Sequence, residues 1–384
     1  MYFLKLVILT YFTLTAFSLS FSIDQTPCTS DGWFGANCEY QCHCAGSAPC
    51  DKHDGSCSSG CHRDWYGPAC QYARMNFTVN GNFNSGWLTD NKDTTCNRGN
   101  LRSVTVTLDT PIPLTWLRVV VSDAVNLNMM FISYRNESSP YTECPESNTA
   151  EINRVTIDIS CPTEYPITSV TLSGQGVNYL CSLYISAGRN VALAQRAKQS
   201  SWFNYLDRKH FLAEHAVDGQ VPNNERSSNF LTCTHTDTGD KSPWWNVSFT
   251  QPVEITRFIL ENRRDCCQER LKNFLLTVYP VNDSYKPIEY RGSYNIKTTY
   301  LVVPSPRISF PVHQVKITEG FNPDRILTLC EVFIFGEIHC PSNRYGLSCE
   351  RECNCVNQTR CFVHSGGCPS GCAPGYTGLD CSEG

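Results

Sequence analysis

The sequence predicts an all-β protein in which two β-sandwiches are flanked by two small disulfide-rich modules. The chain of 384 residues contains 24 cysteines, and those near its two ends repeat the same spacing. Between these ends, short segments alternate apolar and polar residues, are separated by turn residues, and show no long helical period. The length is sufficient for two or three domains.

The first residues are typical of a secretory signal peptide. Lys5 precedes a short apolar run at 6–17, and small residues follow through Ser22, which predicts a cleaved segment at 1–22. The run is too short for a stable membrane span, and no later stretch approaches 18 apolar residues. Because the cysteine count is also high and even, we expect a secreted, extracellular protein.

Charge and glycosylation motifs agree with that location. A formal net charge of −5 gives no sign of a nucleic-acid or anionic-membrane partner. Five sequons occur in the chain, at Asn76, Asn136, Asn246, Asn282 and Asn357. They fit a secreted glycoprotein.

The two terminal modules, 28–72 and 340–384, repeat one cysteine pattern. Seven cysteines from Cys38 to Cys70 recur at a constant offset from Cys349 to Cys381, and one further cysteine precedes each set. Each module has too few apolar residues for a core, so disulfides must stabilise it. Both modules resemble EGF-like repeats of the laminin and multiple-EGF kind. We expect them to serve as spacers or adhesive units, with cysteine pairs that the spacing leaves unassigned.

The blocks 73–186 and 187–338 are interpreted as two copies of one sandwich. They end in the similar segments LCSLYISAG and LCEVFIFGE, and each has a cysteine, Cys96 or Cys233, ahead of its central strands. The first copy is degenerate, because Arg98 stands where the second copy has a histidine two residues after the cysteine.

The stretch 233–271 is the candidate functional region. Two runs in it alternate as half-buried strands do, namely Trp244, Val247 and Phe249, then Val253, Ile255, Arg257 and Ile259. The pattern breaks at 262–265, which places several arginines on a loop, where binding residues are often held by a rigid scaffold.

The residue types on this stretch suit a neutral, hydroxyl-rich ligand. Arg263 and Arg270 supply forks of N–H donors, His235 can donate or accept, and Asp265 can orient an arginine. The alternative is that the arginines are solvated surface charges and His235 is a satisfied loop histidine. No nucleophile–base pair or phosphate loop is present.

The same stretch closely resembles the F-type lectins (fucolectins), a family of fucose-binding β-sandwiches. A histidine shortly after a cysteine, the motif R-x-D-C-C-x-x-R, and the PWW at 243–245 carry the resemblance. It implies a sugar site formed by His235, Arg263, Asp265, Cys266, Cys267 and Arg270. In it, the arginines and histidine donate to sugar oxygens, Asp265 orients, and the adjacent cysteines pack against the ring.

The resemblance also covers other parts of the chain. Phe203, Tyr205 and Phe230 are candidates to hold the sugar methyl group, although simple loop packing is the alternative for each. Residues 73–186 resemble more weakly a degenerate galactose-binding-like (discoidin-like) domain, so both sandwiches are expected to be jelly rolls.

The resemblance further implies a structural calcium ion, which takes hard oxygen ligands. The expected set is Asp218, Gln220, Thr232, Glu331, His215 and Cys330, the last two through backbone carbonyls. Gln220 departs from the usual asparagine of the family. The alternative is that Asp218 caps an Asp-Gly turn and Glu331 is a surface charge.

Corresponding positions in the two copies pair Cys96 with Cys181, and the resemblance pairs Cys233 with Cys330. Cys144 and Cys161 are left together. Cys266 and Cys267 then have only each other, and the family forms this bridge between neighbours. Two free thiols or separate long-range partners are the alternatives.

The predicted function is that of a secreted lectin that binds fucosylated glycans, with cell-surface or matrix glycoproteins as partners. One alternative is an adhesive or receptor ectodomain that uses the lectin fold to bind protein. A hydrolase is disfavoured because neither G-x-S-x-G nor H-E-x-x-H is present. A zinc site formed by Cys233, His235, Cys266 and Cys267 is a further alternative.

Overall fold

The structure, a computed structural model, describes residues 28–81, 85–123, 129–144, 148–204, 211–221, 232–320 and 324–384. These residues form many β-strands and few, short helices, which confirms the all-β prediction. The expected signal peptide at 1–22 lies outside the described residues. No helix within the described ranges is long and apolar enough to cross a membrane.

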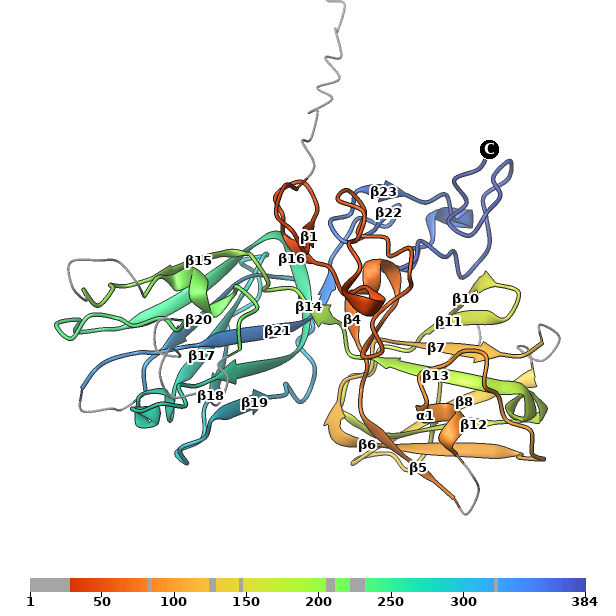
Figure 1. The fold of residues 1–384 in the computed structure, drawn as a ribbon, viewed down its shortest axis with the longest axis horizontal. Coiled ribbons are helices and arrows are strands. Elements are labelled where there is room, and N and C mark those ends of the chain that lie inside the picture. Colours follow the sequence, from red (N-terminus) through yellow and green to blue (C-terminus); the bar gives the residue numbers. More distant parts are fainter. Residues whose placement is uncertain are drawn as a thin grey trace, which may run out of the picture.

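Two antiparallel sheets pack over one core in the block 73–186 (Figure 1). The first sheet has the order β10 (Thr149–Asn153), β11 (Thr156–Ser160), β7 (Trp116–Val121) and β13 (Leu180–Ser186). The second has the order β5 (Phe77–Asn80), β6 (Ser103–Ile112), β12 (Ile167–Ser173), β8 (Phe131–Asn136) and β9 (Thr142–Glu143). The short helix α1 (Gly86–Thr89) buries Leu88 in the same core.

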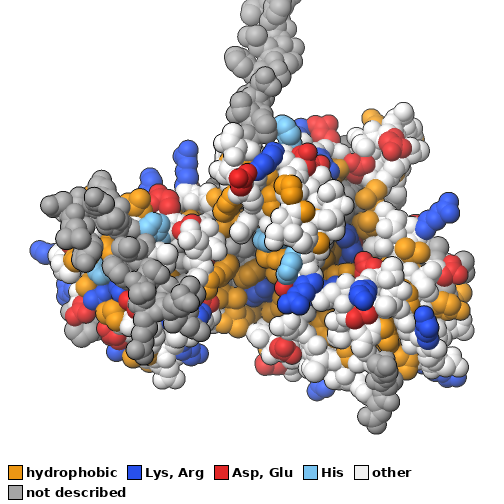
Figure 2. Space-filling view, viewed as in Figure 1, with side chains coloured by type: hydrophobic (Ala, Val, Ile, Leu, Met, Phe, Trp, Pro, Cys, Tyr) orange, Lys and Arg blue, Asp and Glu red, His pale blue; other side chains and the backbone are white. Residues whose placement is uncertain are grey.

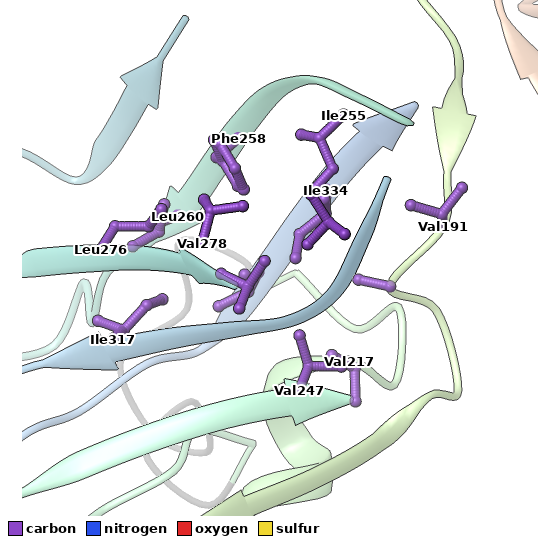
Figure 3. Packing of buried hydrophobic residues seen from close by; sticks show 14 of the residues in the cluster. Val191, Val217, Val247, Ile255, Phe258, Leu260, Leu276, Val278, Ile317 and Ile334 are labelled. Atoms are coloured by element: carbon purple, nitrogen blue, oxygen red, sulfur yellow. The ribbon is translucent and has the colours of Figure 1, made fainter. Parts of the chain in front are cut away.

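The block 187–338 forms a second sandwich around its own core (Figure 3). Its strands run in the order β14 (Arg189–Asn190), β21 (Glu331–Ile338), β16 (Trp244–Glu261), β20 (Val312–Thr318), β17 (Leu275–Pro280) and β18 (Ile288–Arg291). Two further strands, β15 (Arg196–Gln199) and β19 (Thr299–Val302), pair with β16.

Strand β16 is one continuous strand that serves both halves of this sandwich. Its first half pairs with β15 and β20, and its second half pairs with β19 and β21. An irregularity between Ile255 and Arg257 shifts the register. After this shift, Phe258 and Leu260 face the core. The predicted alternation, which continued from Ile255 through Arg257 and Ile259, is therefore wrong in this half of the strand. In the first half, the fully buried tryptophan is Trp245 rather than Trp244, while Val247 is buried as predicted.

The two sandwiches share a cross-link at corresponding places, as the internal repeat predicts. The disulfides Cys96–Cys181 and Cys233–Cys330 hold their Cα atoms 3.8 and 3.9 Å apart. The residue after the first cysteine donates a backbone hydrogen bond to the residue before the second, from Asn97 to Leu180 and from Thr234 to Leu329. The disulfide Cys144–Cys161 is also present, so these pairing predictions are confirmed.

The two terminal modules have the same disulfide connectivity. The first module contains Cys28–Cys38, Cys42–Cys50, Cys44–Cys57 and Cys61–Cys70. The second contains Cys340–Cys349, Cys353–Cys361, Cys355–Cys368 and Cys372–Cys381. Their strands are two-residue pairs: β1 (Trp33–Phe34) with β2 (Tyr40–Gln41), β3 (Trp65–Tyr66) with β4 (Tyr72–Ala73), and β22 (Arg344–Tyr345) with β23 (Arg351–Glu352).

The terminal modules lie beside each other above the two sandwiches (Figure 1). The Tyr40 hydroxyl donates to the Leu347 carbonyl at 2.9 Å, which joins the first module to the last. A cleft of about 1070 Å³ lies between the modules and β14, and none of its lining residues belongs to the predicted sugar or calcium set. Figure 2 shows apolar side chains where the sandwiches meet below the modules.

The C-terminal module also inserts a histidine into the first sandwich. The His364 ring stacks on Trp116 with centroids 3.9 Å apart, and its Nε2 donates to Asp158 at 2.9 Å. Asp158 is fully buried and also accepts two hydrogen bonds from Arg118. Burial raises the pKa of Asp158, but hydrogen bonds from Arg118 and His364 outweigh it and hold that pKa below its usual value. The module therefore satisfies a charge that the sandwich buries.

Replacing His364 should destabilise the whole assembly. In His364→Ala, Asp158 loses one buried hydrogen bond, and we expect the free energy of unfolding to fall by about 1–3 kcal/mol. Denaturant titration of the full chain measures this change. The exposed His53 of the first module offers a matched control, His53→Ala, and equal stability of the two variants would contradict the role assigned to His364.

Candidate functional site

His235 is held in place by its two neighbours. Thr234 and Thr236 each accept a hydrogen bond through the side chain and donate one through the backbone, to Leu329 and Leu327 respectively. The backbone bonds measure 2.7 and 3.1 Å, and both side-chain bonds measure 2.9 Å. Because both flanking residues are fixed and buried, the orientation of the histidine between them is set by the scaffold.

The hydrogen bonds of His235 define a neutral tautomer. Nδ1 lies 2.7 Å from the Thr236 carbonyl and donates to it, whereas Nε2 lies 3.1 Å from Arg270 Nη1 and accepts from it. Burial lowers the pKa of His235 to about 4, and the charges of Arg270 and Arg263 act in the same direction. The bond to Thr236 opposes them. His235 is therefore uncharged at neutral pH.

Arg263 and Asp265 form a bidentate ion pair. Arg263 Nε lies 3.1 Å from Asp265 Oδ1, and Nη2 lies 2.6 Å from Oδ2. The hydrogen bond from Arg263 lowers the pKa of Asp265, despite partial burial. The predicted pairing of an arginine with an orienting carboxylate is thus present in the geometry, and Arg263 itself is buried.

The loop that carries the arginines is anchored by Asn262, a residue that no sequence motif identifies. Its side-chain amide donates to the carbonyls of Gln268 and Lys297, both at 2.9 Å, and its carbonyl oxygen accepts from Arg263 N at 2.9 Å. Asn262 is fully buried. The only sequence feature that points to this role is its place directly after β16, where a loop begins. Buried polar side chains such as this amide are normally hydrogen-bonded, often to backbone groups.

Cys266 and Cys267 form a disulfide with each other, as predicted. Cys266 is exposed, while Cys267 is half-buried and adopts a left-handed conformation with φ of 60°. The short helix η6 (Gln268–Leu271) follows directly and places Arg270 within hydrogen-bond distance of His235. Since Cys233 is bonded to Cys330, all three cysteines of the zinc alternative are in disulfides, and that alternative is wrong.

Aromatic rings enclose one side of His235. The ring centroid of Phe203 lies 4.8 Å from that of His235, and the ring of Phe211 lies 5.4 Å away. Phe203 is thus beside the predicted site. Tyr205 and Phe230, the other candidates for a methyl pocket, lie outside the described residues.

Two carboxylates of the predicted calcium set lie together. Glu331 is fully buried, so its alternative role as a surface charge is wrong. Gly219 N donates to its Oε1 at 3.2 Å, while its Oε2 is buried without a hydrogen-bond partner among the described residues. Burial and the charge of Asp218 raise the pKa of Glu331 to about 8. A carboxylate with an unsatisfied buried oxygen beside a second carboxylate fits a hard cation.

The other residues of the predicted calcium set lie in different surroundings. Asp218 Oδ1 accepts from Gln220 N at 2.9 Å, so Asp218 does cap its turn. The Gln220 residue is exposed. Cys330, which forms the disulfide with Cys233, directly precedes Glu331 in the chain, and Thr232 directly precedes Cys233. His215 lies in the short helix η5 (Ala213–Ala216), and its side-chain Nδ1 is buried without a partner in the described ranges.

One group of three potential metal-binding side chains is found in the described residues, Cys353, Cys355 and Cys361. All three are already in disulfides of the C-terminal module. This group therefore does not act as a metal site while the bridges are intact.

The chain is similar to known proteins over part of its length. The family model described as NedA-like, galactose-binding domain matches residues 215–306. A fucolectin of Anguilla anguilla is 38% identical over 84 residues, which are 21% of this chain and 49% of the eel protein. Fucolectin-3 of Anguilla japonica is 40% identical over 84 residues, or 21% of this chain and 43% of that protein. The chain thus spans about half the length of these curated relatives.

Solved structures with similarity include a fucose binding module of Streptococcus pneumoniae, SpX-3, at 25% identity. It covers 38% of this chain and 96% of its own length, with a TM-score of 0.32. An F-lectin (fucolectin) from the serum of striped bass, Morone saxatilis, is 20% identical, covers 69% of this chain and 97% of its own, and has a TM-score of 0.30. The family match includes the six residues of the predicted sugar site from His235 to Arg270, whereas Phe203, Cys330 and Glu331 lie outside it.

The neutral state of His235 gives a prediction for the pH dependence of stability. Its pKa is about 4 in the folded protein against 6.5 without the fold, so between these values the unfolded chain binds more protons. Stability therefore rises with pH across that window and falls as pH drops from 6.5 to 4. His235→Gln should show a shallower slope than the wild type in denaturant titrations. Equal slopes would contradict the burial of a neutral histidine.

Proposed function

We propose that the chain is a lectin that binds fucosylated glycans without turnover. The observation that carries this proposal is the convergence of His235, the Arg263–Asp265 pair, Arg270 and the Cys266–Cys267 disulfide in one place. Similarity to fucolectins supports it, because relatives of that name are 38% and 40% identical to this chain over 84 residues.

The chemistry of the site favours a neutral, hydroxyl-rich ring. The guanidinium groups of Arg263 and Arg270 present planar sets of N–H donors to sugar oxygens. The exposed Cys266 makes the disulfide available as an apolar surface for one face of the sugar, and Phe203 adds an aromatic ring beside His235. Such a site binds through donor geometry and apolar contact, and no group in it acts as a nucleophile.

We propose the following division of the chain: a signal peptide at 1–22, EGF-like modules at 28–72 and 340–384, a degenerate galactose-binding-like sandwich at 73–186, and an F-type lectin domain at 187–338. The protein is then secreted, and its partners are fucosylated cell-surface or matrix glycoproteins. The alternative is an adhesive or receptor ectodomain in which the lectin fold binds protein. A glycan array separates the two, because specific binding that free fucose competes supports the lectin.

Removal of either arginine should abolish sugar binding and leave folding intact. In Arg263→Ala and Arg270→Ala, the sugar loses charge-assisted hydrogen bonds of about 1.5–3 kcal/mol each, so we expect at least tenfold weaker binding in calorimetry with fucose.

The control for this experiment is Arg196→Ala, which removes an exposed arginine of β15 in the same sandwich. It should bind fucose as the wild type does. Unchanged affinity in both site variants would remove the basis of the proposed sugar site.

We also propose that calcium is bound by Asp218 and Glu331, with oxygens from Thr232, Gln220 and the backbone of His215 and Cys330 completing the set. The ion would supply the counter-charge that the two carboxylates lack and would fix the loop that carries Asp218. The unsatisfied Oε2 of Glu331 supports this proposal.

Calcium should stabilise the folded protein and displace a proton. At 100 times its dissociation constant, a ligand that binds only the native state adds about 2.7 kcal/mol, so chelation should lower the melting temperature. Glu331, with a pKa of about 8, should release its proton when calcium binds at pH 7, which calorimetry in buffers of different ionisation enthalpy measures.

The variants Asp218→Asn and Glu331→Gln should be insensitive to chelation. A wild-type melting curve that is indifferent to both chelator and added calcium would rule out the calcium site while leaving the sugar site standing.

A further inference from the structure

Asp324 lies at the edge of the candidate sugar site, although it is distant in sequence from the other members. Its Oδ2 is 3.6 Å from Nη2 of Arg270, whose Nη1 contacts His235. The Asp324 side chain is 53% exposed and that of Arg270 is 14% exposed. The Asp324 carboxylate is therefore accessible to solvent beside an arginine that is largely buried.

The other polar groups of the site leave few hydrogen-bond acceptors for a ligand. Both oxygens of Asp265 accept from Arg263. His235 accepts from Arg270 through Nε2 and donates through Nδ1. Every sugar hydroxyl carries a hydrogen that needs an acceptor as well as an oxygen that needs a donor. Arginines satisfy the oxygens only.

Asp324 is the carboxylate that can meet this requirement. Within the described part of the chain, its side chain contacts Arg270 at a distance longer than a hydrogen bond, so its oxygens retain acceptor capacity. An ionised carboxylate is also a stronger acceptor than a neutral group. A hydroxyl seated on Arg270 would lie within reach of it.

We infer that Asp324 is a specificity-determining residue whose carboxylate accepts a hydrogen bond from a hydroxyl of the bound sugar. This inference rests on the proposed function of the same site. It also implies discrimination by charge, because a sulfate or carboxylate on the ligand at that position would be repelled by Asp324. The site then selects a free hydroxyl at one sugar position.

The test measures affinities of methyl fucoside and its monodeoxy analogues by calorimetry, using the full chain. Asp324→Ala should weaken binding of the parent sugar by about three- to tenfold. Asp324→Glu, which keeps the carboxylate, should recover part of that loss. One deoxy analogue, which lacks the hydroxyl that Asp324 contacts, should bind the wild type and Asp324→Ala equally well. The exposed Asp283 of the same sandwich provides the matched control, Asp283→Ala.

The outcomes separate this inference from the proposed function. If the wild type binds fucose, Arg263→Ala abolishes binding and Asp324→Ala binds every analogue as the wild type does, the inference alone is overturned. Equal weakening of every analogue would show that Asp324 only positions Arg270, which also overturns the acceptor role. If the wild type binds no fucoside, the proposed function and the inference both fail.

Discussion

The connection between segments 233–236 and 327–330 is the constraint on which the second sandwich depends. It consists of the Cys233–Cys330 disulfide and four hydrogen bonds made by Thr234 and Thr236. On one side it fixes His235 in the candidate sugar site, and on the other it holds Glu331 beside Asp218. His235 lies two residues after Cys233 and Glu331 directly follows Cys330, so the disulfide joins the two segments that carry these candidate site residues. The two candidate sites therefore adjoin the same pair of cross-linked segments.

The first sandwich shows that this connection is a property of the scaffold and does not by itself create a site. It has the corresponding disulfide, Cys96–Cys181, and the corresponding backbone bond from Asn97. Asn97 turns its side chain inward to the Val177 carbonyl, and Arg98, at the position of His235, is exposed. The corresponding positions therefore carry the proposed binding groups in one copy and structural contacts in the other, which is why function has to be argued from the residues of a site.

Local patterns in the sequence predicted the strand-rich fold, the central disulfides and the members of the site, since each depends on spacing or motif. The features that were missed depend on contacts between distant segments. A register shift within β16 reverses which residues face the core after Ile255. His364 of the C-terminal module, which was expected to serve as a spacer or adhesive unit, contacts Asp158 of the first sandwich. Neither Asn262 nor Asp324 belongs to a motif. Asn262 donates to the carbonyls of two separate segments, and Asp324 is distant in sequence from Arg270 and lies beside it only in the folded structure.

The charge balance of the candidate site explains why a neutral ligand suits it. Arg263 and Arg270 are both largely buried, and a buried cation is costly unless it is paired. Asp265 compensates the first and Asp324 lies against the second, while burial keeps His235 uncharged. Two positive and two negative charges therefore nearly cancel before any ligand arrives. An anionic ligand would gain little net attraction and would compete with both carboxylates for the arginines. A sugar can instead use donors and acceptors that are already oriented, without disturbing the ion pairs that hold them.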